Sequence, residues 1–225
     1  RQSLTFKNQP KGALIIQKRD SATGQPLPGA EFRVTTAAGC EVGLDGVIGT
    51  STLTQNGIFT TDAQGEIKIT NLAPGAYVLT EIKAPDGGYV IDTPSTNVVI
   101  GEGGDTQTVV ITNSKAGSLI IDKRDSLTGE PLEGVTFKVT TSTGEYVPDE
   151  NGYISSNGLY KTDKDGKIQI DGVVGTLVVT ETATIPGYSI DPATQTQTVQ
   201  VNPNDTQTPT FYNTPSTTLV IEKYI

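Results

Sequence analysis

Residues 12–29 read GALIIQKRDSATGQPLPG, and residues 117–134 read GSLIIDKRDSLTGEPLEG, nearly the same string 105 positions later. The likeness continues along the chain, because GIFTTDAQGEIKI is matched by GLYKTDKDGKIQI, and AYVLTEIKAPDGGYVID by TLVVTETATIPGYSID. A fixed period of this kind indicates a chain built from repeated structural units. The sequence therefore contains two full units.

Each end of the chain carries part of a further unit. SLTFKNQPKG near the start matches the end of a unit, and TTLVIEKYI at the finish matches a beginning. Most of the length difference between the two full units falls in the Gly-rich stretch 40–57, which marks a surface loop. We divide the chain into the end of a preceding repeat or linker, a first domain, a second domain and the start of a following repeat, at 1–11, 12–115, 116–214 and 215–225.

The composition is that of a sheet protein. Thr, Val and Ile make up 73 of the 225 residues, while 25 Gly and 13 Pro supply turns. Short alternating runs are separated by turn clusters such as DSATG and DAQG, and no run has a helical period. The strands expected in the first unit are 13–18, 31–36, 57–61, 66–70, 76–82, 96–100 and 107–113. Seven short strands per unit predict an all-β chain of two tandem Ig-like antiparallel β-sandwiches.

Composition also excludes several function classes. The chain has no His and one Cys, Cys40, which excludes Ser-His-Asp and Cys-His catalysis and metals bound by imidazole or by several thiolates. We therefore expect no metal and no cofactor. The net charge of −9 argues against nucleic acid as a partner, and no apolar run is long enough to insert into a membrane. A single Cys also excludes an internal disulfide, so stability outside the cell must have another source.

Three polar residues in each unit fall on the apolar face of their strands. Successive side chains of a strand alternate between its faces, so Lys18 shares a face with Leu14 and Ile16. The same count directs one Glu and one Asn per unit toward the core. The residues concerned are Lys18, Glu81 and Asn113 in the first unit, Lys123, Glu181 and Asn213 in the second, and Asn8 and Lys223 in the two partial units.

A rim position, where Lys extends its amine to water and pairs with Glu, explains one such strand. It explains less well why three residue types, Lys, Glu and Asn, fall on the core-facing side of their strands in both units. Burial lowers the pKa of Lys and raises the pKa of Glu, which makes the amine a nucleophile and the carboxyl a proton donor. A protonated Glu bridging the Asn carboxamide can relay protons from amine to leaving ammonia, and the product is an amide between the Lys and Asn side chains.

At these residues the chain resembles the Cna B-type, or SpaA-type, domains of Gram-positive surface adhesins and pilins. The matching motifs are IIQKRDSATGQPLPGAEF and IIDKRDSLTGEPLEGVTF, the segments YVLTEIKAPDGGY and LVVTETATIPGY, and the strand ends ITN and FYN. The resemblance implies a prealbumin-like, inverse-Ig sandwich with a self-formed isopeptide bond. It pairs Lys18 with Asn113 and Lys123 with Asn213, each promoted by Glu81 or Glu181.

The chain departs from the family pattern in two places near these residues. The first Glu-bearing segment has an extra Gly, and the second has Thr184 and Ile185 where an Ala-Pro pair normally sits. Neither change removes the Glu. Asn8 and Lys223 lack partner strands in this chain, so we expect both to remain unreacted.

These observations favour a structural stalk segment of a bacterial cell-surface adhesin or pilus-like protein, located outside the cell and anchored to the wall through another region. Its partners would be neighbouring repeats of the same chain. The alternative is an adhesin module that binds a host glycan or matrix protein through the loop 40–57 or the Thr-rich face of the second unit. We do not expect an enzyme, because the only reactive constellation consumes itself in a single turnover.

Overall fold

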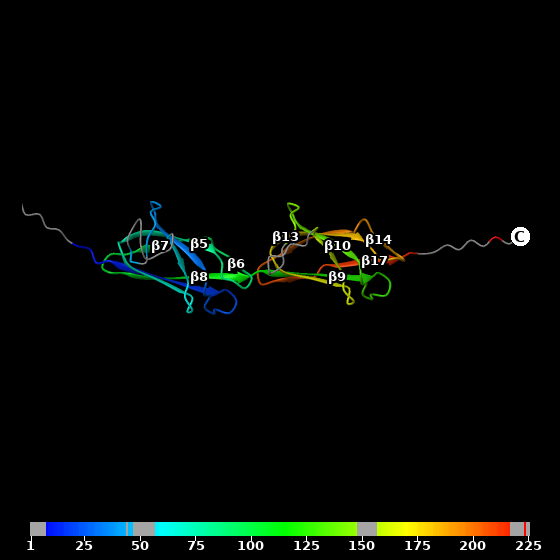
Figure 1. The fold of residues 1–225 in the computed structure, drawn as a ribbon, viewed down its shortest axis with the longest axis horizontal. Helices are drawn as coiled ribbons and strands as arrows, with labels where there is room; N and C mark the ends of the chain where they lie inside the picture. The colour runs from blue at the N-terminus through cyan, green and yellow to red at the C-terminus, as the bar shows by residue number, and fades with distance from the viewer. Residues whose placement is uncertain (1–7, 44, 47–56, 148–156, 217–222, 224–225) are drawn as a thin grey trace, which may run out of the picture. The chain divides into compact units, whose positions relative to one another are not determined.

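A computed structural model of the chain describes residues 8–43, 45–46, 57–147, 157–216 and 223. The chain divides into two compact units, Arg1–Lys115 and Ala116–Ile225. The described residues of both units form strands and turns without a helix (Figure 1). The all-β fold is therefore confirmed, and within the described residues no helix could span a membrane.

The first unit is a sandwich of two four-stranded sheets. One has the strand order β4-β1-β8-β6 and the other the order β3-β2-β5-β7. Their strands are β1 (Gly12–Asp20), β2 (Glu31–Thr36), β3 (Ile58–Thr60), β4 (Glu66–Leu72), β5 (Gly75–Lys83), β6 (Tyr89–Ile91), β7 (Ser95–Ile100) and β8 (Thr106–Lys115).

The second unit repeats this plan. Its sheets have the orders β12-β9-β17-β14 and β11-β10-β13-β15, and a short extra strand, β16, pairs with β9. The strands are β9 (Gly117–Asp125), β10 (Thr136–Thr141), β11 (Leu159–Lys161), β12 (Lys167–Val173), β13 (Gly175–Ala183), β14 (Tyr188–Ile190), β15 (Thr196–Val201), β16 (Thr206–Gln207) and β17 (Thr210–Pro215).

Alternation of buried and half-buried residues runs along the first strand of each unit. Every second residue of β1 and of β9 is buried. The buried faces of the two sheets meet in one apolar core per unit, to which Leu14 and Ile16 contribute from one sheet and Phe32 and Leu79 from the other. Each such side chain stabilises the fold by about 1.5 to 3 kcal/mol. The hydrophobic effect therefore holds the two sheets together.

The first and last strands of each unit pair in parallel, whereas the other main pairs are antiparallel. In the first unit β1 and β8 pair over eight residues, from Ala13 opposite Thr106 to Asp20 opposite Asn113. The sequence pattern predicts antiparallel strands, and the parallel direction of this pair was not predicted. A parallel pair needs a long crossover connection, and here the whole of the rest of the unit forms that connection.

All seven strands predicted for the first unit are present, and no end differs from its predicted position by more than two residues. An eighth strand, β6, was not predicted, and its counterpart in the second unit is β14. The residues of β6, Tyr-Val-Ile, are all half-buried and show no alternation of apolar and polar side chains, so β6 was not recognised from the sequence. It pairs with the end of β8, where Ile91 lies opposite Asn113.

Candidate functional site

The three polar residues of the first unit meet inside the sandwich. Lys18 comes from β1 and Asn113 from the neighbouring β8, while Glu81 comes from β5 in the opposite sheet. All three are buried, with exposed fractions of 0%, 0% and 4%. The side chains therefore point to the side that strand alternation predicts.

Short contacts connect the three groups in a ring. Lys18 Nζ donates to Glu81 Oε2 at 2.8 Å and to Asn113 Oδ1 at 2.6 Å. Asn113 Nδ2 donates to the other carboxyl oxygen, Glu81 Oε1, at 2.6 Å. The backbone N–H of Asp92 lies 3.4 Å from Asn113 Oδ1. One carboxyl group therefore bridges the amine and the carboxamide nitrogen, while the amine contacts the carboxamide oxygen.

The strand register produces this arrangement. Lys18 lies opposite Ile111 in the parallel pair, so Asn113 is two positions further along β8, on the same face. On β5, the pairing with β2 shifts directly beyond Glu81, which lies opposite Phe32. A bulge of this kind re-aims the neighbouring side chain. The Lys18 amine also lies 5.9 Å from the centre of the Phe32 ring.

A tight turn closes over the strand that carries Lys18. The backbone N–H of Lys18 donates to the carbonyl of Gly65 at 2.7 Å. Gly65 has a φ of 69°, and a Cβ atom on it would lie 2.6 Å from the Lys18 carbonyl oxygen. Gly166 has the same relation to Lys123 in the second unit, at 2.5 Å. These positions require glycine, which explains why the DAQG and DKDG turns both end in it.

Burial shifts the pKa values of two groups in the first site. It lowers the pKa of Lys18, and the nearby Glu81 carboxyl opposes this only in part. Burial also raises the pKa of Glu81, against the opposing effect of the Lys18 amine. Both shifts favour the neutral pair, an uncharged amine beside a protonated carboxyl. An uncharged amine has the lone pair that a nucleophile needs.

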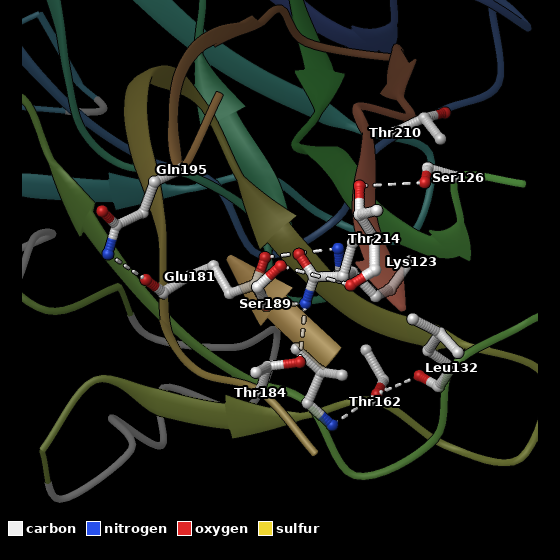
Figure 2. Close-up of polar contacts among 12 residues, drawn as sticks. Lys123, Ser126, Leu132, Thr162, Glu181, Thr184, Ser189, Gln195, Thr210 and Thr214 are labelled. Atoms are coloured by element: carbon white, nitrogen blue, oxygen red, sulfur yellow. Dashed lines mark hydrogen bonds and ion pairs between the residues drawn. The ribbon is translucent and has the colours of Figure 1, made fainter. Parts of the chain in front are cut away.

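The second unit brings the equivalent residues together with a different hydrogen-bond pattern (Figure 2). Lys123 Nζ lies 3.3 Å from Glu181 Oε2, and Asn213 Nδ2 donates to Glu181 Oε1 at 2.5 Å. Asn213 Nδ2 also donates to the hydroxyl of Thr184 at 2.7 Å. Exposed fractions of Lys123, Glu181 and Asn213 are 0%, 1% and 1%, and burial lowers the pKa of Lys123.

Two further contacts recur in both units and were missed by the sequence analysis. The buried Thr61 hydroxyl donates to the Leu27 carbonyl and accepts from the Ala30 N–H, and Thr162 does the same in the second unit. The Tyr89 hydroxyl donates to Asp20, the second residue after Lys18. Tyr188 and Asp125 repeat that bond. The only sequence signal was identity between the aligned repeats.

The remaining candidates lie away from these sites. Asn8 and Lys223 are exposed, and their unreacted state stays a prediction. In the loop 40–57, residue 44 and residues 47–56 lie outside the described residues, and Cys40 is exposed. The host-binding alternative for this loop therefore stays a prediction. No group of three or more His, Cys, Asp or Glu in the described part of the chain could hold a metal ion.

Each site combines an amine, a carboxamide and a carboxyl group that contacts both. This set can exchange one amide for another, because the carboxyl can move a proton from the attacking amine to the departing nitrogen. Water is excluded from the buried groups, which strengthens each of their electrostatic interactions. No external substrate is needed, since both reacting groups belong to the chain.

Comparison with known proteins places both units in one family. The family model for the SpaA prealbumin-like fold domain matches residues 12–115 and 117–215. No protein of curated function matches the sequence.

Solved structures of bacterial pilins are similar in fold. A streptococcal ancillary pilin is 23% identical, with a TM-score of 0.53, over 92% of this chain and 62% of the pilin. The chain thus spans less than two thirds of that protein. GBS52, the minor pilin of Streptococcus agalactiae, is 20% identical, with a TM-score of 0.45. The match covers 95% of this chain and 100% of the GBS52 chain. The shaft pilin SpaA of Lactobacillus rhamnosus GG is 16% identical over 93% and 100%, with a TM-score of 0.44.

Proposed function

The chain belongs to the family of SpaA prealbumin-like fold domains, and from this premise we propose that it is a structural segment of a pilus or cell-surface stalk, each unit locked by an amide bond between Lys and Asn side chains. Its place is outside a Gram-positive cell, where it carries other parts of the protein away from the wall. The family match and the pilin-like fold of the streptococcal structure support this role.

The single observation that carries the proposal is the buried ring of Lys18, Glu81 and Asn113. A buried Lys–Glu pair adds little stability by itself, because removing two charges from water costs several kcal/mol. The same elements are nevertheless present in both units, with the carboxyl in contact with amine and carboxamide each time. A reaction that ends in a neutral amide explains this arrangement better than an ion pair kept for stability.

The reaction balances without any added reagent. Lys18 Nζ adds to Cγ of Asn113, and the developing charge on Oδ1 faces the backbone N–H of Asp92. One proton passes from Nζ to Glu81 while the carboxyl gives its own proton to Nδ2. The bond between Cγ and Nδ2 then breaks and ammonia leaves. Glu81 ends in the protonation state in which it began, whereas Lys18 and Asn113 are consumed.

The bond would also determine how the unit bears tension. The chain enters the unit through β1 and leaves through β8, and Lys18 and Asn113 lie near the same end of this parallel pair. A covalent link between them carries the force directly from β1 to β8. Residues 19–112, which hold the rest of the core, then lie off the path of the force. Repeating such units lengthens a stalk without adding a weak point.

The intact mass of the purified chain tests the proposal. We expect a mass lower than that calculated from the sequence by two ammonia molecules. Glu81→Ala and Glu181→Ala should each restore the mass of one ammonia, and the double variant both. Glu102→Ala, which changes an exposed glutamate, is the matched control and should keep the full deficit. A wild-type chain with the full calculated mass would refute the cross-links.

A further inference from the structure

The two sites differ at the carboxamide oxygen of the Asn. In the first unit Asn113 Oδ1 accepts a hydrogen bond from Lys18 Nζ at 2.6 Å. In the second unit the buried Asn213 Oδ1 has no hydrogen-bond partner among the described residues. Lys123 Nζ, also buried, makes no hydrogen bond there and is held by its ion pair with Glu181 Oε2 at 3.3 Å. An unpartnered buried polar atom is costly, so some other interaction must hold the carboxamide in this orientation.

Thr184 provides that interaction. Its hydroxyl accepts a hydrogen bond from Asn213 Nδ2 at 2.7 Å (Figure 2). Nδ2 also donates to Glu181 Oε1, so both of its hydrogens take part in hydrogen bonds. Thr184 is the first residue after β13, three positions beyond Glu181. The equivalent residue after β5 is Ala84, whose methyl group cannot accept a hydrogen bond.

We propose that Thr184 is a positioning residue that holds the Asn213 carboxamide turned away from the Lys123 amine, so that the second unit forms its cross-link more slowly than the first. This inference rests on the proposed function, and it adds an order to the two reactions. The first unit would close soon after folding, and the second would remain open longer.

The chemistry of the addition step gives the physical reason. Nζ must approach Cγ while a donor stabilises the charge that develops on the oxygen. In the first unit Oδ1 already faces Lys18 Nζ and the Asp92 N–H. In the second unit Lys123 Nζ and Asn213 Oδ1 are not hydrogen-bonded, and we infer that bringing them together breaks the bond between Asn213 Nδ2 and Thr184. Breaking one buried hydrogen bond slows the reaction about tenfold, the equivalent of about 1.4 kcal/mol.

The rates can be measured separately in the full chain. Glu181→Ala leaves only the first unit able to react, and Glu81→Ala leaves only the second. Each protein is isolated unreacted in urea, diluted into refolding buffer, and quenched in acid at intervals. The loss of one ammonia is then followed by intact mass. We expect the second unit to react about ten times more slowly than the first.

Substitutions at the two equivalent positions identify the cause. In the Glu81→Ala background, Thr184→Ala and Thr184→Val remove the hydroxyl and should raise the rate to near that of the first unit, while Thr184→Ser keeps the hydroxyl and should remain slow. In the Glu181→Ala background, Ala84→Thr should slow the first unit. Circular dichroism during refolding checks that the variants fold at equal rates.

The outcomes separate this inference from the proposed function. Equal rates in the two units, or a second unit that reacts more slowly without the hydroxyl, would overturn the role of Thr184 and leave the cross-links intact. A chain that loses no ammonia in either unit would refute the proposed function, and the inference with it.

Discussion

The stability of the first unit should fall sharply when its cross-link is prevented without leaving a buried charge. The double substitution Lys18→Met and Glu81→Gln does this, because Met and Gln keep nearly the volume of the original side chains. It removes the nucleophile and the proton-shuttling carboxyl together. Changing Lys18 or Glu81 alone would leave its partner buried and unpaired, which by itself costs about 3 to 5 kcal/mol.

The expected loss follows from the loop that the bond closes. Lys18 and Asn113 are separated by 95 positions. Closing a loop of this length lowers the conformational entropy of the unfolded chain. In the chain-entropy treatment used for disulfides, this raises the free energy of unfolding by about 4 to 5 kcal/mol. The free energy of unfolding of a small domain falls by about 2 to 6 kcal/mol for each molar increase in guanidinium chloride. The unfolding midpoint of the first unit should therefore fall by about 1 to 2 M.

Hydrogen exchange read by mass spectrometry across a guanidinium series follows each unit separately through its own peptides. The second unit in the same molecule is the internal control, and its midpoint should not move. The reciprocal variant, Lys123→Met with Glu181→Gln, should lower only the midpoint of the second unit. Intact mass confirms which bond each protein contains.

Two results would refute this reasoning. If the midpoint of the first unit falls by less than about 0.3 M while its ammonia deficit disappears, the bond forms but does not act through loop closure. If wild type and variant have the same mass and the same midpoint, the buried groups are only a polar network.

Two further predictions concern contacts outside the ring. Thr61→Val leaves the Leu27 carbonyl and the Ala30 N–H without their partner, so the first unit should lose about 2 to 4 kcal/mol in guanidinium unfolding; an unchanged midpoint would contradict this. The pKa of Asp20 is lowered from 3.8 to about 2, chiefly by the hydrogen bond from Tyr89. The depressed pKa in the folded state means that the Asp20 carboxylate stabilises the unit above pH 3.8 and loses this effect as the pH falls toward 2. Tyr89→Phe should therefore reduce the loss of unfolding free energy between about pH 6 and about pH 2.5, and identical pH profiles would argue against the bond.

Much of the fold could be predicted because strand alternation is a local property. The face that holds Leu14 and Ile16 also holds Lys18, and the burial observed along β1 follows that pattern. Repetition allowed the same argument to be made twice, at Lys18 and at Lys123. β6 was not predicted because its three half-buried residues, Tyr-Val-Ile, show no alternation, although it pairs with the end of β8 that carries Asn113.

The hydrogen-bond pattern of each site could not be predicted, because it depends on residues brought together from different strands. Thr184 appeared in the sequence only as a departure from a motif. Its contact with Asn213 spans 29 positions and exists because β13 and β17 belong to opposite sheets that face each other. The Thr61 hydroxyl, likewise, bridges two backbone groups on a distant connection.

By itself the sequence determined the all-β class, the two-unit repeat and the inward direction of one Lys, one Glu and one Asn per unit, since all three depend on local period and on repetition. The resemblance predicted that Lys18, Asn113 and Glu81 meet, but the parallel direction of the first and last strands, and the hydrogen bonds that join the three groups, became visible in the tertiary structure alone. Pairing between residues nearly a hundred positions apart is fixed by the packing of two sheets around one core, and no local pattern along the chain encodes it.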